Sequence, residues 1–505
     1  MLIVAVMFSA ARASKPKWQK VERPTNSISL TELGYPGYSP QLQSLNIALV
    51  TANFVDSTHA LVTYHARTLV TRSSEDRSSD EPRNIDALLL EIPSGRVLAR
   101  AEWHVFDYGR YLWPLGQGRF LLRIRNSLRV LDPLTNLASE NPLSQQPLLR
   151  SDQPLESLSV SRLSTAMIVE SALPATSGDW LQQPPASSKG PVLLSLLRLK
   201  EDVDHHMTAV LQARLRSPEP FTLPLDTAGY LMTEPMDAHT WSATFTPYDG
   251  PQKKLAPIES VCPPVVELTG RSTYIALTCR GEESSGLVSY DFSGHEVWEE
   301  RFLSDSPHFA AIAAPDAARF AVSRTIQGGG QPVSPDALST PPDAQEIRVY
   351  GDLSGDLLAQ VKSMDAFQIP QNFDLSPDGL QLMVMEKGQL RLFALPPVSA
   401  QEAGDVAYLA TLAPPSVEGP MNLHALEAPI DEVMAQKAAD EKQAAQRRAR
   451  FPQPLGAAAS EIAVGPVAAA AENQPPLPGD DAAPRKKPTL LLPGEKPEFG
   501  QPNPR

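Results

Sequence analysis

Cys262 and Cys279 are the only two cysteines of the 505-residue chain, and their spacing suits a disulfide. A two-residue turn at Gly270-Arg271, midway between them, would set the two thiols opposite each other on paired strands. Pro263 and Pro264 interrupt the strand where this pairing is needed, because proline has no N–H to donate. The alternative is two separate buried thiols, since a free cysteine packs as a small hydrophobe.

Asp204-His205-His206 is the one cluster of residue types that bind metals. Adjacent residues of an extended chain point to opposite faces, so they cannot easily bind one ion together. We therefore interpret this segment as an exposed strand or loop and assign no metal ligand.

The common catalytic motifs are absent from the sequence. It contains no HExxH, GxSxG or CxxC motif and no GxxxxGK followed by Ser or Thr. Gly116-Gln117-Gly118 lacks the third glycine of a dinucleotide-binding loop because position 121 is Leu121, and it predicts a hairpin turn. We assign no catalytic residue, no cofactor-binding residue and no cofactor from the sequence.

The segment from Asn372 to Leu395 contains one complete structural unit. Ser376-Pro377-Asp378-Gly379 has the residues of a tight turn, and two apolar strands follow it, 380–385 and 390–395. Only four residues separate these strands, which predicts an antiparallel hairpin. Apolar residues lie on both faces of the strands, so we expect each face to be covered.

Similar units recur along the chain. Ala314-Pro315-Asp316-Ala317 is followed by the same kind of apolar strand as the turn at 376–379. Seven such strands begin at Ala60, Phe120, Ala166, Tyr230, Tyr274, Phe320 and Leu382. Their mean spacing of about 54 residues is near the period of about 40–50 residues of a four-stranded propeller blade. The sequence therefore predicts an all-β, seven-bladed β-propeller of four-stranded antiparallel blades over residues 41–415.

Three polar inserts, 71–84, 172–190 and 325–345, account for the uneven spacing of the units. Each is predicted to lie between the second and third strands of its blade, which places all three on one face of the propeller. Long loops in compact domains are often functional, so the inserts are candidates for a binding rim. Neutral, mobile excursions are the alternative.

Other parts of the chain flank the propeller. Residues 14–40 read as an irregular lead-in and 405–412 as the outer strand of the last blade. Residues 425–450 predict a helix, with acidic residues near its start, alanines in its middle and arginines at its end. The segment 451–505 is rich in proline and alanine and predicts a disordered tail.

Charge and the N-terminal residues bear on location and partners. The net charge of −14 argues against nucleic acid as a partner. Residues 1–13 combine a short apolar run with a small-x-small pattern and predict a signal peptide, cleaved between Ala13 and Ser14. The run lacks a basic beginning, so a buried strand or a start inside a longer signal is the alternative. We expect a periplasmic or secreted protein without a transmembrane segment in the mature chain, the alternative being cytoplasmic.

The repeats resemble those of bacterial YVTN-type and WD-repeat-like β-propellers, with 376–379 and 314–317 as the best matches. This resemblance covers most of 45–412 and implies a fold rather than an activity; the Trp-Asp dipeptide of WD repeats is missing. Gly294 to Trp298 also resembles the G-x-x-x-W of quinoprotein repeats, which hold pyrroloquinoline quinone. The positions equivalent to Trp298 in two other blades are Ala99 and Ala359.

Two functions are consistent with these observations. The first is a non-catalytic, exported binding or scaffold propeller that recognises a protein or small-molecule ligand through one loop-decorated face. The second is a propeller enzyme, a quinoprotein-like oxidoreductase or a lactonase-like hydrolase, with its site in the central channel. Charged groups converging in the channel would favour catalysis, and an apolar lining would favour binding. The sequence does not indicate an oligomeric state.

Overall fold

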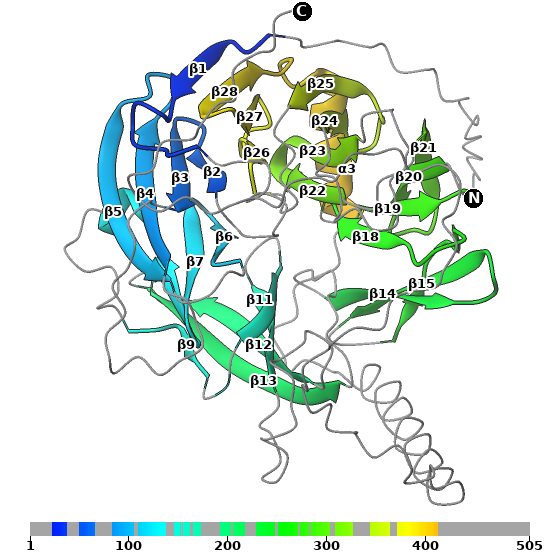
Figure 1. Cartoon of the computed structure of the whole chain (residues 1–505). Helices are drawn as coiled ribbons and strands as arrows, with labels where there is room; N and C mark the ends of the chain where they lie inside the picture. The colour runs from blue at the N-terminus through cyan, green and yellow to red at the C-terminus, as the bar shows by residue number, and fades with distance from the viewer. Residues whose placement is uncertain are drawn as a thin grey trace, which may run out of the picture. The chain divides into compact units, whose positions relative to one another are not determined.

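Seven four-stranded antiparallel sheets follow one another around a central axis (Figure 1). The predicted seven-bladed β-propeller is thus confirmed. The computed structural model describes residues 23–412 with gaps, of which the longest are 38–49, 66–82, 173–191, 218–228 and 327–343. Met1–Asp440 form one compact unit, and the second unit, Glu441–Arg505, lies outside the described residues. The predicted signal peptide, the helix predicted at 425–450 and the predicted tail also fall outside them.

Blades 1 to 3 each consist of four consecutive strands that pair in chain order. Their strands are β2 (Val50–Asp56), β3 (His59–His65), β4 (Arg83–Glu91) and β5 (Val97–Val105); β6 (Leu112–Gly116), β7 (Arg119–Ile124), β8 (Ser127–Leu131) and β9 (Leu149–Arg150); and β10 (Leu155–Val160), β11 (Ala166–Ala172), β12 (Val192–Glu201) and β13 (Met207–Ser217). The short helix α2 (Pro133–Asn136) follows β8.

Blades 4 to 6 follow the same order, although blade 4 is less regular. Their strands are β14 (Gly229–Pro235), β15 (Thr240–Pro247), β16 (Lys253–Lys254) and β17 (Ile258–Glu259); β18 (Val265–Leu268), β19 (Thr273–Cys279), β20 (Ser284–Asp291) and β21 (Glu296–Leu303); and β22 (Phe309–Ala314), β23 (Arg319–Ile326), β24 (Ala344–Gly351) and β25 (Leu357–Ser363). In blade 4, β16 and β17 both pair with β15, because Pro257 and its neighbours interrupt the third strand.

Blade 7 is closed by the two ends of the propeller segment. It contains β26 (Phe373–Leu375), β27 (Gln381–Glu386), β28 (Gln389–Ala394) and, as its outer strand, β1 (Asn26–Ser29). Asn26 pairs with Leu392 and Ser29 with Gln389. The prediction of an irregular segment over 14–40 is therefore wrong for these four residues. Their paired residues lie 360 or more positions away in the sequence, so no local pattern marks these four residues as a strand.

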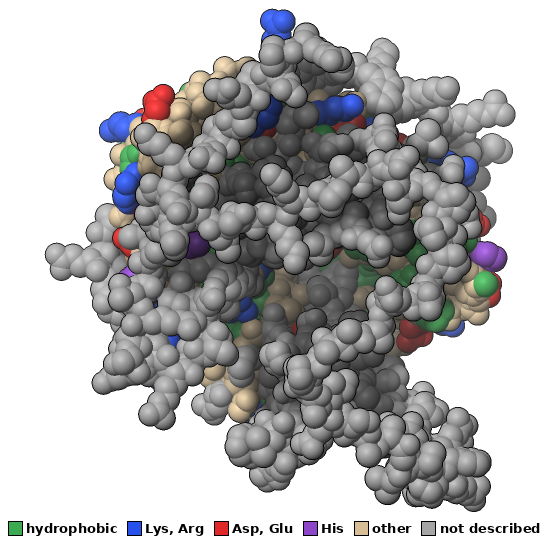
Figure 2. All heavy atoms as spheres, in the orientation of Figure 1, with side chains coloured by type: hydrophobic (Ala, Val, Ile, Leu, Met, Phe, Trp, Pro, Cys, Tyr) green, Lys and Arg blue, Asp and Glu red, His purple; other side chains and the backbone are tan. Residues whose placement is uncertain are grey.

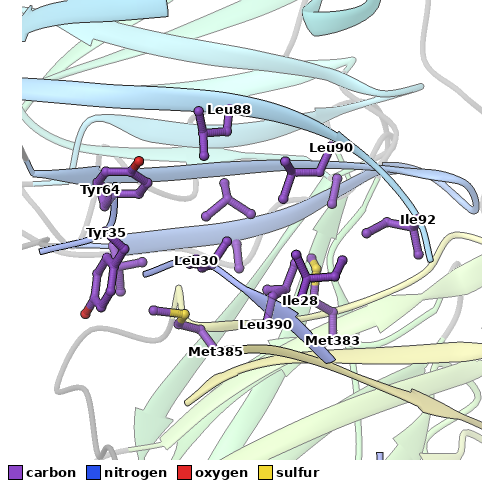
Figure 3. Close-up of a cluster of buried hydrophobic side chains, with 14 of the residues drawn as sticks. Ile28, Leu30, Tyr35, Tyr64, Leu88, Leu90, Ile92, Met383, Met385 and Leu390 are labelled. Carbon is purple, nitrogen blue, oxygen red and sulfur yellow. The ribbon is translucent and has the colours of Figure 1, made fainter. Parts of the chain in front are cut away.

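Apolar packing reinforces this closure. Figure 3 shows Ile28 and Leu30 from the N-terminal segment against Met383, Met385 and Leu390 of blade 7, with side chains of blade 1 on the other side. Leu30 and Leu390 are fully buried. Burying such side chains stabilises a fold by about 1.5–3 kcal/mol each. The N-terminal segment thus joins the last blade to the first through packing as well as strand pairing.

The segment predicted as the outer strand of blade 7, 405–412, belongs instead to helix α3 (Ala400–Leu412). The helix begins with a capping box. The Glu402 N–H donates to Ser399 Oγ at 3.1 Å, and the Ser399 N–H donates to Glu402 Oε2 at 2.7 Å. Strand β1 already occupies the outer edge of the blade, so the chain after β28 is free to leave the sheet.

No helix in the described part of the chain is long and apolar enough to cross a membrane.

One arginine anchors the start of α3. Arg319, the first residue of β23, has a fully buried side chain that donates from Nε and Nη2 to the two carboxylate oxygens of Glu402, at 2.7 and 2.9 Å. Its Nη1 donates to the carbonyl oxygens of Gly379 and Pro396, both at 2.7 Å. Burial disfavours ionised Glu402, but the bonds from Arg319 and the Ser399 N–H outweigh it and lower the pKa of Glu402. Arg319 therefore ties the helix to blades 6 and 7.

The second-to-third connections of three blades are much longer than the first-to-second connections. The three long gaps 66–82, 173–191 and 327–343 each join the second strand of a blade to the third, as predicted, although the flanking strands extend one or two residues into the predicted inserts. Because neighbouring strands are antiparallel, these connections leave from one face, here called the insert face. The first-to-second connections of all seven blades leave from the opposite face and have at most five residues.

Candidate functional site

A channel of about 1230 Å³ runs between the first strands of the blades. The first strand of every blade contributes residues to the channel wall; these strands are β2, β6, β10, β14, β18, β22 and β26. A volume of this size exceeds the roughly 300–1,000 Å³ of a typical small-molecule site. The channel is therefore the candidate functional site within the described residues.

The described lining combines apolar residues from every blade with polar and charged residues, and its polar and apolar surfaces are similar in area. The charged lining residues are Arg110, Arg119, Lys200, Glu201, Glu267, Asp316 and Asp374. The described lining contains no histidine or cysteine, and no group of three metal-binding side chains lies in the described part of the chain.

Arg110 lies just before β6, at the end of that strand which faces the insert side. Its Nε donates to the carbonyl oxygen of Leu112 at 3.1 Å, and its Cζ lies 5.4 Å from the centroid of the Trp113 ring. Arg123 approaches the same ring at 5.9 Å. Burial lowers the pKa of Arg110 to about 10, against the favourable charge of Glu267. A guanidinium is thus held in a fixed orientation and partly desolvated.

Asp374 and Gln371 connect the inner strands across blade boundaries. Asp374 accepts hydrogen bonds from the N–H of Phe54 at 2.6 Å and from the N–H of Leu375 at 2.8 Å. The Gln371 Nε2 donates to the carbonyl oxygen of Leu112 at 3.1 Å. These bonds use backbone groups of β2 and β6 that no strand covers on the channel side. They hold blade 7 to blades 1 and 2 at the axis, as β1 does at the rim.

Burial also changes the acidity of Asp374. It raises the pKa of Asp374 to about 7, although the two N–H donors favour the ionised form. A carboxyl group that titrates near neutral pH in a cavity is a common feature of functional sites. Structural networks produce the same effect, and here both oxygens already contact backbone donors.

Arg119 and Glu201 form an ion pair on the opposite side from the inserts. The Arg119 Nη2 lies 2.9 Å from Glu201 Oε2 and also donates to Gln117 Oε1 at 2.9 Å. Gln117 has a positive φ of 52°, as expected in the tight turn predicted at 116–118. Side chains of blades 2 and 3 are thereby joined at this end of the channel.

Of the residues considered as metal ligands, the structure describes only His206. Its Nδ1 lies 3.7 Å from Asp202 Oδ2, in the turn between β12 and β13, and its side chain is 78% exposed. Asp204 and His205 fall in one of the gaps, as do Ala13 and Ser14 of the predicted cleavage site. His206 is not among the described residues that line the channel.

Cys262 and Cys279 are joined in a disulfide, with Cα atoms 5.6 Å apart. The strand register differs slightly from the expected one: Val265 pairs with Leu277, so the turn is centred half a residue beyond Gly270-Arg271. The segment at Pro263 and Pro264 leaves the ladder, which brings Cys262 back opposite Cys279. The bridge connects the end of blade 4 to the second strand of blade 5.

Trp298, the tryptophan of the quinoprotein-like pattern, lies between blades 5 and 6. Its Nε1 donates to the carbonyl oxygen of Asp352 at 2.9 Å, and its ring stacks on Phe320 and Tyr350. A Cβ on Gly355 would come within 2.6 Å of this ring, and Gly355 has a φ of 66°. The pattern Gly294 to Trp298 therefore serves interblade packing, and it places no side chain in the channel.

Charged side chains do not form one large patch on the surface in Figure 2. Among the residues coloured there, acidic and basic side chains are scattered around the periphery.

No protein-family model and no curated protein matches the sequence. Among solved structures, the chain is similar to an acylaminoacyl peptidase from Pyrococcus horikoshii, with 8% identity and a TM-score of 0.40 over 68% of this chain and 50% of that chain. It is also similar to the C-terminal WD40 domain of Sif2, with 10% identity and a TM-score of 0.36 over 69% of this chain and 98% of that chain. The chain thus spans half the length of the peptidase. At these TM-scores, the matches carry no argument about function.

Proposed function

We propose that this chain is a non-catalytic binding or scaffold propeller that recognises its partner through the insert face. The observation that carries the proposal is the position of the three long connections, 66–82, 173–191 and 327–343, each between a second and a third strand. The equivalent connections of blades 2 and 7 contain only two residues, 125–126 and 387–388. Three long additions at the same topological position are typical of a recognition surface.

The channel lining supports the same proposal. The pairs that bring its charged groups together, such as Arg119 with Glu201, join neighbouring blades. Asp374 and Gln371 likewise hold the inner strands together. Charged residues in these positions stabilise the ring, and a charged group that is already paired is less available for acid–base chemistry.

Shortening the three inserts tests the proposal. Replacing 66–82, 173–191 and 327–343 with short turns should abolish capture of the partner that the intact protein retrieves from native extract, while thermal unfolding stays nearly unchanged. The matched control shortens 138–145, which connects the third and fourth strands of blade 2 on the opposite face. Retained capture by the trimmed protein, or equal loss in the control, would contradict a binding role for the insert face.

A channel enzyme, quinoprotein-like or lactonase-like, is the second candidate. The observation in its favour is Asp374, because burial raises the pKa of this carboxyl to about 7 inside the cavity. A carboxyl that titrates there can serve as a general base or acid. If the protein without the three inserts still captures the partner, the insert face is not the binding surface, and the channel becomes the favoured site.

Export is part of the proposed function, and mass analysis tests it. Natively expressed protein, analysed without reductant, should begin at Ser14 and show Cys262 bound to Cys279. The second expectation depends on the first, because structural disulfides persist mainly in oxidising compartments. An intact Met1 together with two freely alkylated thiols would contradict export and favour a cytoplasmic protein.

A further inference from the structure

We propose that Asp374 binds the ammonium group of an alkylamine inside the axial channel. The site lies on the wall where blades 7 and 1 meet, and it does not depend on partner binding at the insert face. It would give the propeller a site for a small organic cation beyond the proposed partner surface.

Asp374 presents a carboxylate to the channel without a cation beside it. The residue lines the channel and is half-buried. Its two oxygens accept the N–H groups of Phe54 and Leu375, at 2.6 and 2.8 Å. No charged side chain of the described residues pairs with it or contributes to its pKa. Because a carboxylate removed from water without a counter-charge is costly, Asp374 offers a place that a cationic ligand can fill.

The strands packed against β26 bring no basic side chain to this carboxylate. They are β2, β22, β23 and β27, and their basic residues are Arg319 and Arg324 of β23, which pair with Glu402 and Glu346. Arg110 donates to the carbonyl oxygen of Leu112, as Gln371 does, but it has no part in the pKa of Asp374. The negative charge of Asp374 is therefore not balanced by these residues.

Two carboxamides of the same wall also have free acceptors. The Ala52 N–H donates to the backbone carbonyl oxygen of Gln371 at 2.7 Å, and two residues later the Phe54 N–H donates to Asp374. Asn53, between them, lines the channel, and its side chain forms no hydrogen bond with the described residues. Gln371 is 5% exposed and its Oε1 has no partner. Buried acceptors are normally paired, so a donor is missing from this wall.

These acceptors match a primary ammonium better than a guanidinium. An ammonium is a compact charge with three diverging N–H donors, and the free acceptors belong to separate side chains. A guanidinium binds best across both oxygens of one carboxylate, and both oxygens of Asp374 already accept backbone N–H groups. Strand β22, next to β26, lines the channel with Ala310, Ala311 and Ala313. These small side chains leave room for an alkyl chain.

Ligand-observed NMR titration of the full-length protein with butylammonium tests the proposal. At pH 8 the carboxyl of Asp374, whose pKa is about 7, is mostly ionised, and a primary amine keeps its proton. The wild type should bind butylammonium at least about tenfold more tightly than the neutral 1-pentanol. Asp374→Asn should remove this preference because it deletes the charge and keeps the shape. Butyltrimethylammonium, which has no N–H donor, should bind at least about threefold more weakly than butylammonium.

Matched variants separate binding from folding and from net charge. Asp356→Asn removes an exposed carboxylate between β24 and β25, outside the described channel lining, and should bind butylammonium as the wild type does. If Asp374→Asn fails to fold, Asn53→Leu decides the matter. It deletes the amide at similar volume and should weaken butylammonium binding at least about threefold without changing the binding of 1-pentanol.

A lysine peptide with blocked ends identifies the source of the amine. Tighter binding of this peptide than of butylammonium would support the site and assign it to a lysine side chain of a protein. Weaker binding would support the site and assign it to a free amine.

Four outcomes would overturn the proposal. The wild type shows no preference for butylammonium over 1-pentanol at millimolar concentration; Asp374→Asn keeps that preference; or, where Asp374→Asn does not fold, Asn53→Leu binds butylammonium unchanged. The fourth is equal or tighter binding of butyltrimethylammonium or butylguanidinium, which would replace the primary ammonium by another cation.

Discussion

Replacing Glu402 with alanine is expected to lower the free energy of unfolding by about 3–5 kcal/mol, the usual cost of leaving one member of a buried ion pair without its partner. The Arg319 side chain is completely buried, and Glu402 binds it through two hydrogen bonds of 2.7 and 2.9 Å. The variant would leave a desolvated guanidinium facing carbonyl oxygens alone. Equilibrium denaturation of wild type and variant measures the difference.

The effect of Glu402→Ala should extend to helix α3. The Glu402 carboxylate also accepts the Ser399 N–H, so the variant loses half of the capping box. The buried Leu409 of this helix lies next to Gly270 in the turn between β18 and β19, so α3 connects blade 7 with blade 5. We therefore expect faster proteolysis within 400–412 in the variant than in the wild type.

Two comparisons isolate the buried pair. Glu259→Ala breaks the ion pair between Glu259 and Arg280. The Glu259 side chain is 79% exposed, so this variant should lower the free energy of unfolding by at most about 1 kcal/mol. The double variant Arg319→Met with Glu402→Leu replaces the pair by apolar groups and should recover most of the lost stability. Equal losses for Glu402→Ala and Glu259→Ala would show that burial does not strengthen the contribution of this pair.

The blades could be predicted because each is encoded by local sequence. A turn such as 376–379 followed by two apolar runs determines a hairpin without reference to the rest of the chain, and β27 and β28 form where expected. The positions of the three long connections followed from the spacing of these units. Local residue patterns therefore sufficed for the number of blades and for the insert face.

The closure of the ring could not be predicted in the same way. Strand β1 has only four residues, and its pairing depends on an exposed edge of β28 far along the chain. Helix α3 did have a local signal, because Ser399 and Glu402 have the spacing of a capping box. The continuous apolar run from Val406 to Ala410 also fits a short strand, so this signal did not decide the prediction.

The candidate site was beyond sequence analysis for a geometric reason. Arg110, Glu267 and Asp374 belong to blades 2, 5 and 7, and only the circular arrangement brings them to one channel. No motif spacing relates these residues. The burial of Arg319 was equally hidden, because its acceptors come from a turn at Gly379 and a helix at Glu402.

The wild-type protein should lose stability relative to Asp374→Asn as the pH rises from about 4 to about 7. Burial raises the folded-state pKa of Asp374 to about 7, and its usual value is 3.8. Between these values the folded state binds a proton that the unfolded state has released, so raising the pH removes a stabilising contribution. The full contribution is present below the unfolded-state pKa, and at most about 4 kcal/mol is lost by pH 8.

Denaturation curves of both proteins at several pH values between 4.5 and 8 measure this difference. The asparagine variant cannot titrate at this position, and subtracting its free energies of unfolding from those of the wild type cancels the contributions of the other ionisable groups. The physical reason is the loss of hydration on burial, which the hydrogen bonds from the N–H groups of Phe54 and Leu375 offset only in part. Parallel pH profiles would mean that channel water solvates Asp374, and both its role as a titrating link between blades 7 and 1 and its candidacy as a catalytic acid or base would then be rejected.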